Sequence, residues 1–150
     1  MRTRSFAAVA LLLAAACSEG SGTASALRVR TDASAYGLPG GGPAASEVTV
    51  HFTVRNTGSE PIAVPNCGIN VATMVERREG GSWVQVSSSV CPAFAIYAPV
   101  VLAPGDVAEG FIAVNGAGEY RLRVPVSPEV GQEFSDFATS PDFVVRWLTD

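Results

Sequence analysis

Residues 47–55 read EVTVHFTVR and set the pattern for most of the chain. The apolar side chains Val48, Val50, Phe52 and Val54 alternate there with polar or charged ones. Successive side chains of an extended strand point to opposite faces, so this period predicts a strand with one face buried and one in water. Such a strand needs a second layer of structure to cover its apolar face.

The same alternation recurs further along the sequence. Residues 120–126 place Tyr120, Leu122 and two valines on one side of a predicted strand, and residues 27–30 and 143–147 repeat the pattern over shorter lengths. A Pro-Gly-Asp turn at 104–106 punctuates another pair of apolar runs. Because turns follow one another about every ten residues and no long amphipathic helix is present, we expect an all-β chain folded as an antiparallel β-sandwich.

Glycine-containing pairs indicate where strands reverse. Gly80-Gly81 separates residues 69–78 from residues 83–86, and Asn115-Gly116 separates residues 107–114 from a strand starting near Glu119. Both pairs tolerate positive φ and therefore predict hairpins. Residues 36–45 hold four glycines and two prolines, and we expect a long loop there.

The N-terminus has the order of a secretory signal peptide. Arg2 and Arg4 precede an apolar run of 11 residues, which is well short of the roughly 20 residues that span a bilayer. Residues 13–17, Leu-Ala-Ala-Ala-Cys, resemble the bacterial lipoprotein signal, although Ala14 stands where that signal usually has leucine. The resemblance implies that Cys17 is acylated and becomes the first residue of the mature chain.

Ordinary secretion is the alternative, because Ala14-x-Ala16 also fits the small-residue pattern for release. That alternative leaves Cys17 as an unpaired thiol on an exported protein. We expect a signal peptide over residues 1–16, a flexible tether over 17–26 and the sandwich domain over 27–150. The protein is then expected in the cell envelope, lipid-anchored to a bacterial membrane and either periplasmic or surface-exposed.

The two cysteines other than Cys17 form an even pair, which an oxidising compartment favours as a disulfide. Cys67 lies 13 residues before Gly80, and Cys91 lies 10 residues after Gly81. The open end of the predicted hairpin therefore brings the two sulfur atoms together. A metal site would need further ligands, and His51 belongs to a different strand, so we expect a structural disulfide.

The formal net charge is −4, and all ten basic residues are arginine. An acidic chain argues against nucleic acid as a partner. It also argues against docking onto anionic lipid by charge, so membrane attachment is expected from acyl chains on Cys17 alone. The absence of lysine excludes Schiff-base chemistry.

Groups that could support catalysis are few. His51, the one histidine, lies on the polar side of its predicted strand, and no Gly-x-Ser-x-Gly motif follows a strand. The acidic stretch 127–142 matches no EF-hand spacing, so we expect a solvated loop rather than a calcium site. We therefore predict no enzyme activity, no cofactor and no metal. Exposed aromatic side chains are the candidates for a binding surface, since such residues dominate contact hot spots: Trp83, Tyr97 and Tyr36.

Several turn motifs resemble a bacterial family. Residues 56–62, NTGSEPI, are similar to a corner of bacterial immunoglobulin-like domains, and GSW (81–83), LAPGD (102–106) and GEY (118–120) continue in the order seen in the intracellular proteinase inhibitor (BsuPI-like) type. The resemblance implies an immunoglobulin-like sandwich of about seven to nine strands with Tyr120 as a corner tyrosine. The family's Tyr/Phe-Asp-Phe stretch is absent, and Met74-Val75-Glu76 stands nearby.

These observations predict a non-enzymatic, lipid-anchored envelope protein that acts as an interaction or assembly module for an unidentified protein partner. The alternative implied by the resemblance is a protease inhibitor that presents residues 90–101 as a loop held by the disulfide.

Overall fold

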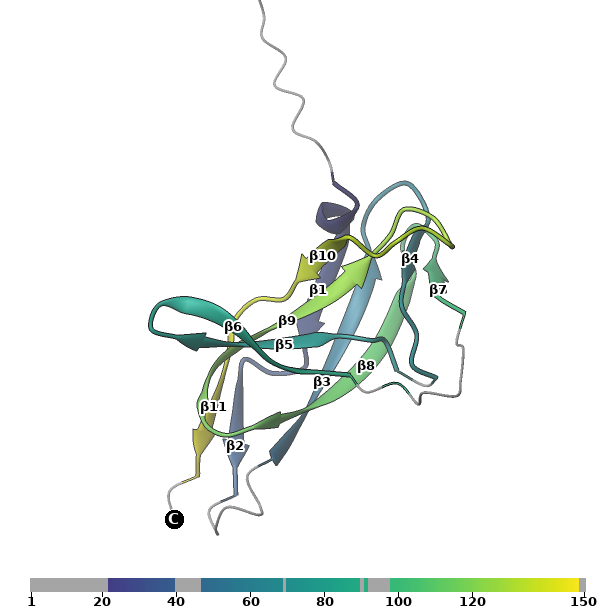
Figure 1. Cartoon of the computed structure of the whole chain (residues 1–150). Coiled ribbons are helices and arrows are strands. Elements are labelled where there is room, and N and C mark those ends of the chain that lie inside the picture. The colour runs from purple at the N-terminus through teal and green to yellow at the C-terminus, as the bar shows by residue number, and fades with distance from the viewer. Residues whose placement is uncertain (1–21, 40–46, 69, 90, 92–97, 149–150) are drawn as a thin grey trace, which may run out of the picture.

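The computed structural model describes residues 22–39, 47–68, 70–89, 91 and 98–148, which form a short 3-10 helix and eleven strands (Figure 1). The helix is η1, Thr23–Ala26. The strands are β1 (Leu27–Thr31), β2 (Ala35–Leu38), β3 (Glu47–Asn56), β4 (Ile62–Val64), β5 (Met74–Glu79), β6 (Ser82–Ser88), β7 (Val100–Leu102), β8 (Val107–Asn115), β9 (Gly118–Val126), β10 (Asp136–Thr139) and β11 (Phe143–Trp147). No helix in the described part of the chain is long and apolar enough to cross a membrane.

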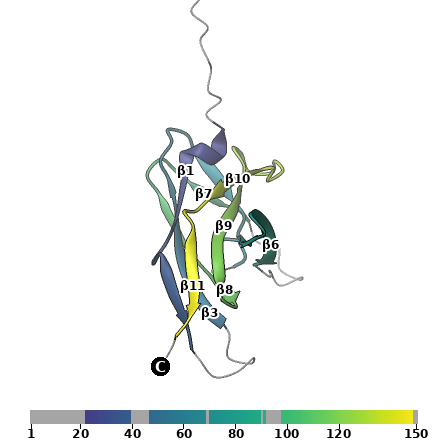
Figure 2. The ribbon, with the colours of Figure 1, turned by 90° about the vertical axis from the view of Figure 1, so that its left-hand side faces the viewer.

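Two sheets form the layers of the sandwich (Figures 1 and 2). The smaller sheet has the order β1-β3-β8, and the larger sheet has the order β2-β11-β9-β5-β6, with β10 also paired to β9. In immunoglobulin lettering these are sheets A-B-E and A′-G-F-C-C′, so the expected immunoglobulin-like β-sandwich is confirmed. One pair, β2 with β11, is parallel, and the other pairs of named strands are antiparallel.

The structure has more strands than the seven to nine expected because several strands are divided. The first edge strand begins in the smaller sheet as β1 and crosses to the larger sheet as β2. Residues 36–38, predicted to belong to a long loop, therefore form part of β2, and their register with β11 is set by Tyr36 opposite Val145. Residues 40–46 of that predicted loop lie outside the described residues.

The core lies between the sheets, where the alternation of the sequence placed it. Val50, Phe52 and Val54 of β3 are buried, and Leu122 and Val124 of β9 face them from the other layer. Burial of these side chains is the main favourable contribution to folding, at about 25 cal/mol for each Å² of apolar surface removed from water.

The turn at Asn115-Gly116 differs from the hairpin that its sequence predicted. β8 pairs with β3 in the smaller sheet, whereas β9 belongs to the larger sheet, so the turn carries the chain between layers. Gly116 has a φ of 81°, which suits glycine. The Tyr120 hydroxyl lies 2.9 and 3.0 Å from the carbonyl oxygens of Asn115 and Gly116, to which it donates. This is the tyrosine corner expected for residue 120.

The stretch expected as a tether ends in ordered structure. Thr23–Ala26 form η1, whose Ala24 and Ala26 pack against the core. The Ala24 N–H donates to the Asp136 carboxylate at 3.1 Å. Because Asp136 begins β10, part of the predicted acidic loop is a strand.

Candidate interaction surface

The β5–β6 hairpin projects from the side of the sandwich (Figure 1). Gly80 and Gly81 have φ values of 57° and 88°, so both central residues of its two-residue turn are left-handed, as in a type I′ turn. The predicted Gly80-Gly81 hairpin is therefore confirmed. We call the hairpin, together with the outer face of β9 beside it, the hairpin surface.

Two valines of β6 are exposed although such side chains are usually buried in a sandwich. Val84 is 41% exposed and Val86 is 43% exposed. The larger sheet is five strands wide, from β2 at one edge to β6 at the other, whereas the smaller sheet is three strands wide. The edge strand β6 therefore extends past the opposite layer. The described residues therefore leave about two fifths of each valine open to solvent.

The other side of the hairpin carries a tryptophan between arginines. Trp83 is half-buried, and the Arg121 guanidinium lies 4.4 Å from the centre of its ring. Arg78, opposite Trp83 in the strand register, lies 5.8 Å from the same ring. These are cation–π distances. Along β9, Arg123 lies 4.0 Å from the ring centre of Phe137 and repeats the arrangement.

A buried glutamate fixes two of these arginines. The Glu76 side chain is 8% exposed and accepts hydrogen bonds from Arg121 Nε at 2.6 Å and Arg123 Nη1 at 3.0 Å. Burial acts to raise the pKa of Glu76, but the hydrogen bonds and charges of Arg121 and Arg123 outweigh it and hold the pKa below its ordinary value. Two guanidiniums are thus held in place by charge, hydrogen bonds and aromatic rings.

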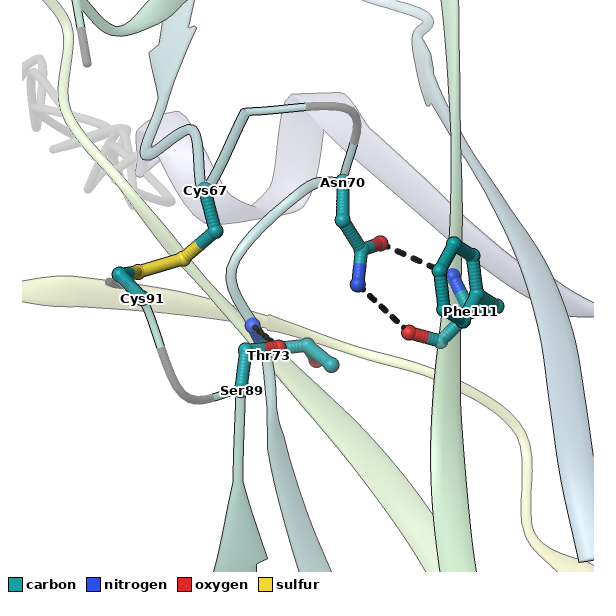
Figure 3. Close-up of a disulfide and its surroundings, with 6 residues drawn as sticks. All are labelled: Cys67, Asn70, Thr73, Ser89, Cys91 and Phe111. Atoms are coloured by element: carbon teal, nitrogen blue, oxygen red, sulfur yellow. Dashed lines mark hydrogen bonds between the residues drawn. A yellow bond between two sulfur atoms is a disulfide. The ribbon is translucent and has the colours of Figure 1, made fainter. Parts of the chain in front are cut away.

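The base of the hairpin is closed by the predicted disulfide (Figure 3). Cys67 and Cys91 are bonded, with their Cα atoms 4.9 Å apart across a sequence separation of 24. Next to it, the Thr73 N–H donates to Ser89 Oγ at 3.0 Å, and the Ser89 N–H donates to the Thr73 carbonyl at 2.8 Å. The two chain segments that enter and leave the hairpin are therefore joined by both covalent and polar contacts.

Asn70, which the sequence did not single out, covers an edge of the smaller sheet. Its Nδ2 donates to the Phe111 carbonyl at 2.7 Å, and its Oδ1 accepts from the Phe111 N–H at 2.9 Å (Figure 3). The amide satisfies the backbone groups of one β8 residue as a neighbouring strand would. The two residues are 41 positions apart, so only the folded register reveals the pair.

The remaining aromatic candidates do not join Trp83. Tyr36 lies on β2 at the opposite edge of the larger sheet, where its hydroxyl donates to the Asp32 carboxylate and accepts from the Ala33 N–H. Burial, followed by the hydrogen bond to Asp32, raises the pKa of Tyr36 to about 12. Through these contacts Tyr36 holds the turn that connects β1 with β2. Tyr97 and Cys17 lie outside the described residues.

His51 is exposed on the outer face of the smaller sheet, with its ring centre 6.1 Å from that of Phe111. Over the described ranges, no three His, Cys, Asp or Glu side chains group as a metal site would require. Most of the loop 90–101, predicted as the inhibitory segment, lies outside the described residues.

Comparisons with known proteins give only distant structural likeness. No protein-family model matches the chain, and no curated protein matches it. The sporulation control protein Spo0M of Bacillus subtilis is similar at 10% identity and a TM-score of 0.42, over 83% of this chain and 50% of that one. The CARDB domain of the PF1109 protein of Pyrococcus furiosus, in complex with di-metal ions, has 18% identity and a TM-score of 0.37, over 80% and 87%.

A β-glucosidase of Erythrobacter marinus is also similar, at 12% identity and a TM-score of 0.36. The match covers 79% of this chain but only 15% of the glucosidase. None of these likenesses assigns an activity or a ligand to the present chain.

Proposed function

We propose that this chain is a non-enzymatic, lipid-anchored envelope protein whose immunoglobulin-like domain binds a protein partner through the hairpin surface. Three features support the proposal. The N-terminal segment resembles a lipoprotein signal ending at Cys17, the Cys67–Cys91 disulfide suits an oxidising compartment, and the hairpin presents exposed apolar and arginine side chains.

The observation that carries the binding proposal is that Arg121 lies over the ring of Trp83 while its guanidinium is bonded to Glu76. Tryptophan and arginine are the residue types most enriched among binding hot spots. Because Glu76 already orders Arg121, little side-chain freedom remains to be lost when a partner binds. Arg121 bonds Glu76 through Nε, and this bond does not use the donors on its two Nη groups.

The chemistry of the surface indicates what the partner should present. Val84 offers exposed apolar area on one side of β6, and Trp83 with Arg78 and Arg121 occupies the other. Val86 is also exposed and lies at the bulge where the β5–β6 register shifts. We infer a partner segment with an apolar residue flanked by carboxylates.

Photo-crosslinking in intact cells tests the binding proposal. A photoreactive amino acid at Val84 should form an adduct with one protein, and Trp83→Ala in the same chain should abolish that adduct. The matched control places the photoreactive group at Thr49, which is exposed on the smaller sheet. Equal adducts at both positions, or none at Val84, would show that the hairpin surface does not bind the partner.

Metabolic labelling with a clickable fatty acid tests the anchor separately. The unchanged chain should incorporate the label, and Cys17→Ala should not. Equal labelling of the two chains would rule out acylation at this cysteine.

A further inference from the structure

A second arginine cluster lies on the outer face of the smaller sheet. Arg28 and Arg30 of β1 and Arg55 of β3 are exposed and alternate with buried Leu27 and Val54. Arg28 lies directly opposite Arg55 in the strand register. β1 begins immediately after η1, so the cluster lies at the end of the sandwich where the chain enters the domain (Figure 1).

Among the described residues, these three arginines form no ion pair with a carboxylate. Like charges directly opposite one another destabilise a sheet. The four ion pairs found in the described ranges involve other arginines, all on β5 and β9. Two acids, Asp32 and Glu109, line a neighbouring cavity together with Arg30, and neither forms an ion pair with it. Glu109 lies opposite Thr53 on β8, so that β3 stands between it and Arg30.

The three arginines surround a small cavity that suits a phosphate group. Its volume is about 310 Å³. The residues that line it are Arg28, Arg30, Thr53, Arg55, Thr57 and Val107. A guanidinium presents a planar fork of donors that matches phosphate oxygens, and two neighbouring guanidiniums can donate to the same phosphate. A hydroxyl such as that of Thr53 adds a further donor.

We propose that Arg28, Arg30 and Arg55 bind the phosphate groups of anionic phospholipid headgroups, so that the domain lies against the membrane that holds its anchor. The choice of lipid rests on the proposed acylation of Cys17. Thr23, where η1 begins, follows Cys17 by six residues, a length that spans at most roughly 20 Å when fully extended. The tether therefore keeps the cluster within reach of headgroups at high effective concentration.

The acidic net charge, from which we expected no attraction to anionic lipid, does not decide this contact. At physiological salt, charges act over a Debye length of about 10 Å or less. Within that range of the headgroups the local excess of arginine matters more than carboxylates elsewhere on the domain.

Vesicle cosedimentation of the chain from Ser18 onward, which lacks both the acylated cysteine and the apolar run 6–16, tests the site without acyl chains. We expect binding to phosphatidylcholine vesicles that contain about one third phosphatidylglycerol, no binding to phosphatidylcholine alone, and release at about 0.5 M salt. Adding Arg28→Gln and Arg55→Gln should weaken binding about tenfold or more. The control is Arg146→Glu, an equal loss of charge at an exposed position of β11, which should retain binding.

Each other outcome overturns the proposal. Equal weakening by the control would reduce the effect to net charge, and equal binding to both vesicle types would exclude headgroup recognition. Inorganic phosphate is tested alone by thermal shift. If it stabilises the chain through Arg28 and Arg55 while vesicles do not bind, the ligand is free phosphate rather than a membrane. Because this chain is unacylated, failure here leaves the Cys17 labelling result unaffected.

Discussion

The two outer faces of the sandwich both present arginine, but they hold it differently. On the larger sheet, Arg121 and Arg123 share a buried Glu76 and lie over the rings of Trp83 and Phe137. On the smaller sheet, Arg28, Arg30 and Arg55 lie side by side with no ion pair to a described carboxylate. An arginine paired with a carboxylate stabilises the fold and is held rigidly at the surface. Unpaired arginines that lie side by side destabilise the fold by mutual repulsion, which a bound anion would reduce. The presence of a buried glutamate therefore distinguishes arginines that are held in the fold from arginines that are open to an anionic ligand.

Removing the disulfide should have the largest effect on stability and should leave the arginine cluster of the smaller sheet able to bind. For Cys67→Ser combined with Cys91→Ser, the chain-entropy model gives a loss of about 3 kcal/mol for a loop of this length. Urea denaturation measures the free energy of unfolding. Where the variant is folded, vesicle binding through Arg28 and Arg55 should be unchanged. Parallel loss of stability and vesicle binding would show that the two faces are not independent.

Glu76→Gln should destabilise the protein by about 2 kcal/mol, because it removes the negative charge between Arg121 and Arg123. The cost is below that of a fully buried pair because solvent reaches these arginines, whose side chains are 27% and 32% exposed. Glu79→Gln, which affects the exposed pair with Arg77, should cost less than about 0.5 kcal/mol. Equal melting temperatures for the two variants would contradict the distinction between a buried and an exposed glutamate.

Acidification should affect the same face through the same carboxylate. The pKa of Glu76 is lowered in the folded protein, so the unfolded chain takes up the proton first as pH falls. The stabilisation is fully present above the ordinary glutamate pKa of 4.5 and is lost as pH falls through the lower folded value. Thermal melts between neutral pH and acid should show this fall, and Glu76→Gln should flatten it. An unchanged slope in the variant would assign the acid sensitivity to other carboxylates.

Alkaline pH should test the hydrogen bonds of Tyr36, which lie where the chain crosses from β1 in the smaller sheet to β2 in the larger sheet. The pKa of Tyr36 is raised to about 12 by burial and by its bond to Asp32, above the ordinary value of 10.0. The hydroxyl's contribution to stability is therefore present below pH 10 and is lost as pH rises toward 12. We expect a modest fall in melting temperature over this interval, which Tyr36→Phe should remove. A fall of the same size in the variant would exclude Tyr36 as its cause.

Local patterns predicted most of the strands because strand period and turn chemistry are properties of neighbouring residues. The alternation around Phe52, the Gly80-Gly81 hairpin and the Cys67–Cys91 pair all follow from short spacings. The turn after Asn115 shows the limit of this reasoning. Turn chemistry indicates that the chain reverses, but it does not say whether the two strands pair in one sheet or face one another across the core.

The candidate site was predicted only in part for a related reason. Trp83 could be identified as a candidate because it is aromatic and closely follows the Gly80-Gly81 turn. Its partner Arg121 belongs to a strand that is distant in the sequence. The bonds from Glu76 to Arg121 and Arg123 join residues more than 40 positions apart and require the β5–β9 register. The exposure of Val84 was beyond the reach of alternation, because alternation distinguishes the two sides of a strand without showing whether a second layer covers either side.

The smallest expected effect is the most informative about the two faces, because its sign should differ between them. Arg55→Gln removes a charge opposite Arg28 and should raise stability by about 0.5 kcal/mol when no anion is bound. Arg123→Gln removes a partner of buried Glu76 and should lower stability. The same Arg55→Gln chain should bind phosphatidylglycerol vesicles more weakly than the unchanged chain. Urea denaturation of both variants in phosphate-free buffer measures the difference. If Arg55→Gln were destabilising as well, Arg55 would have a stabilising partner, and the smaller-sheet cluster would be part of the fold rather than a site for an anion.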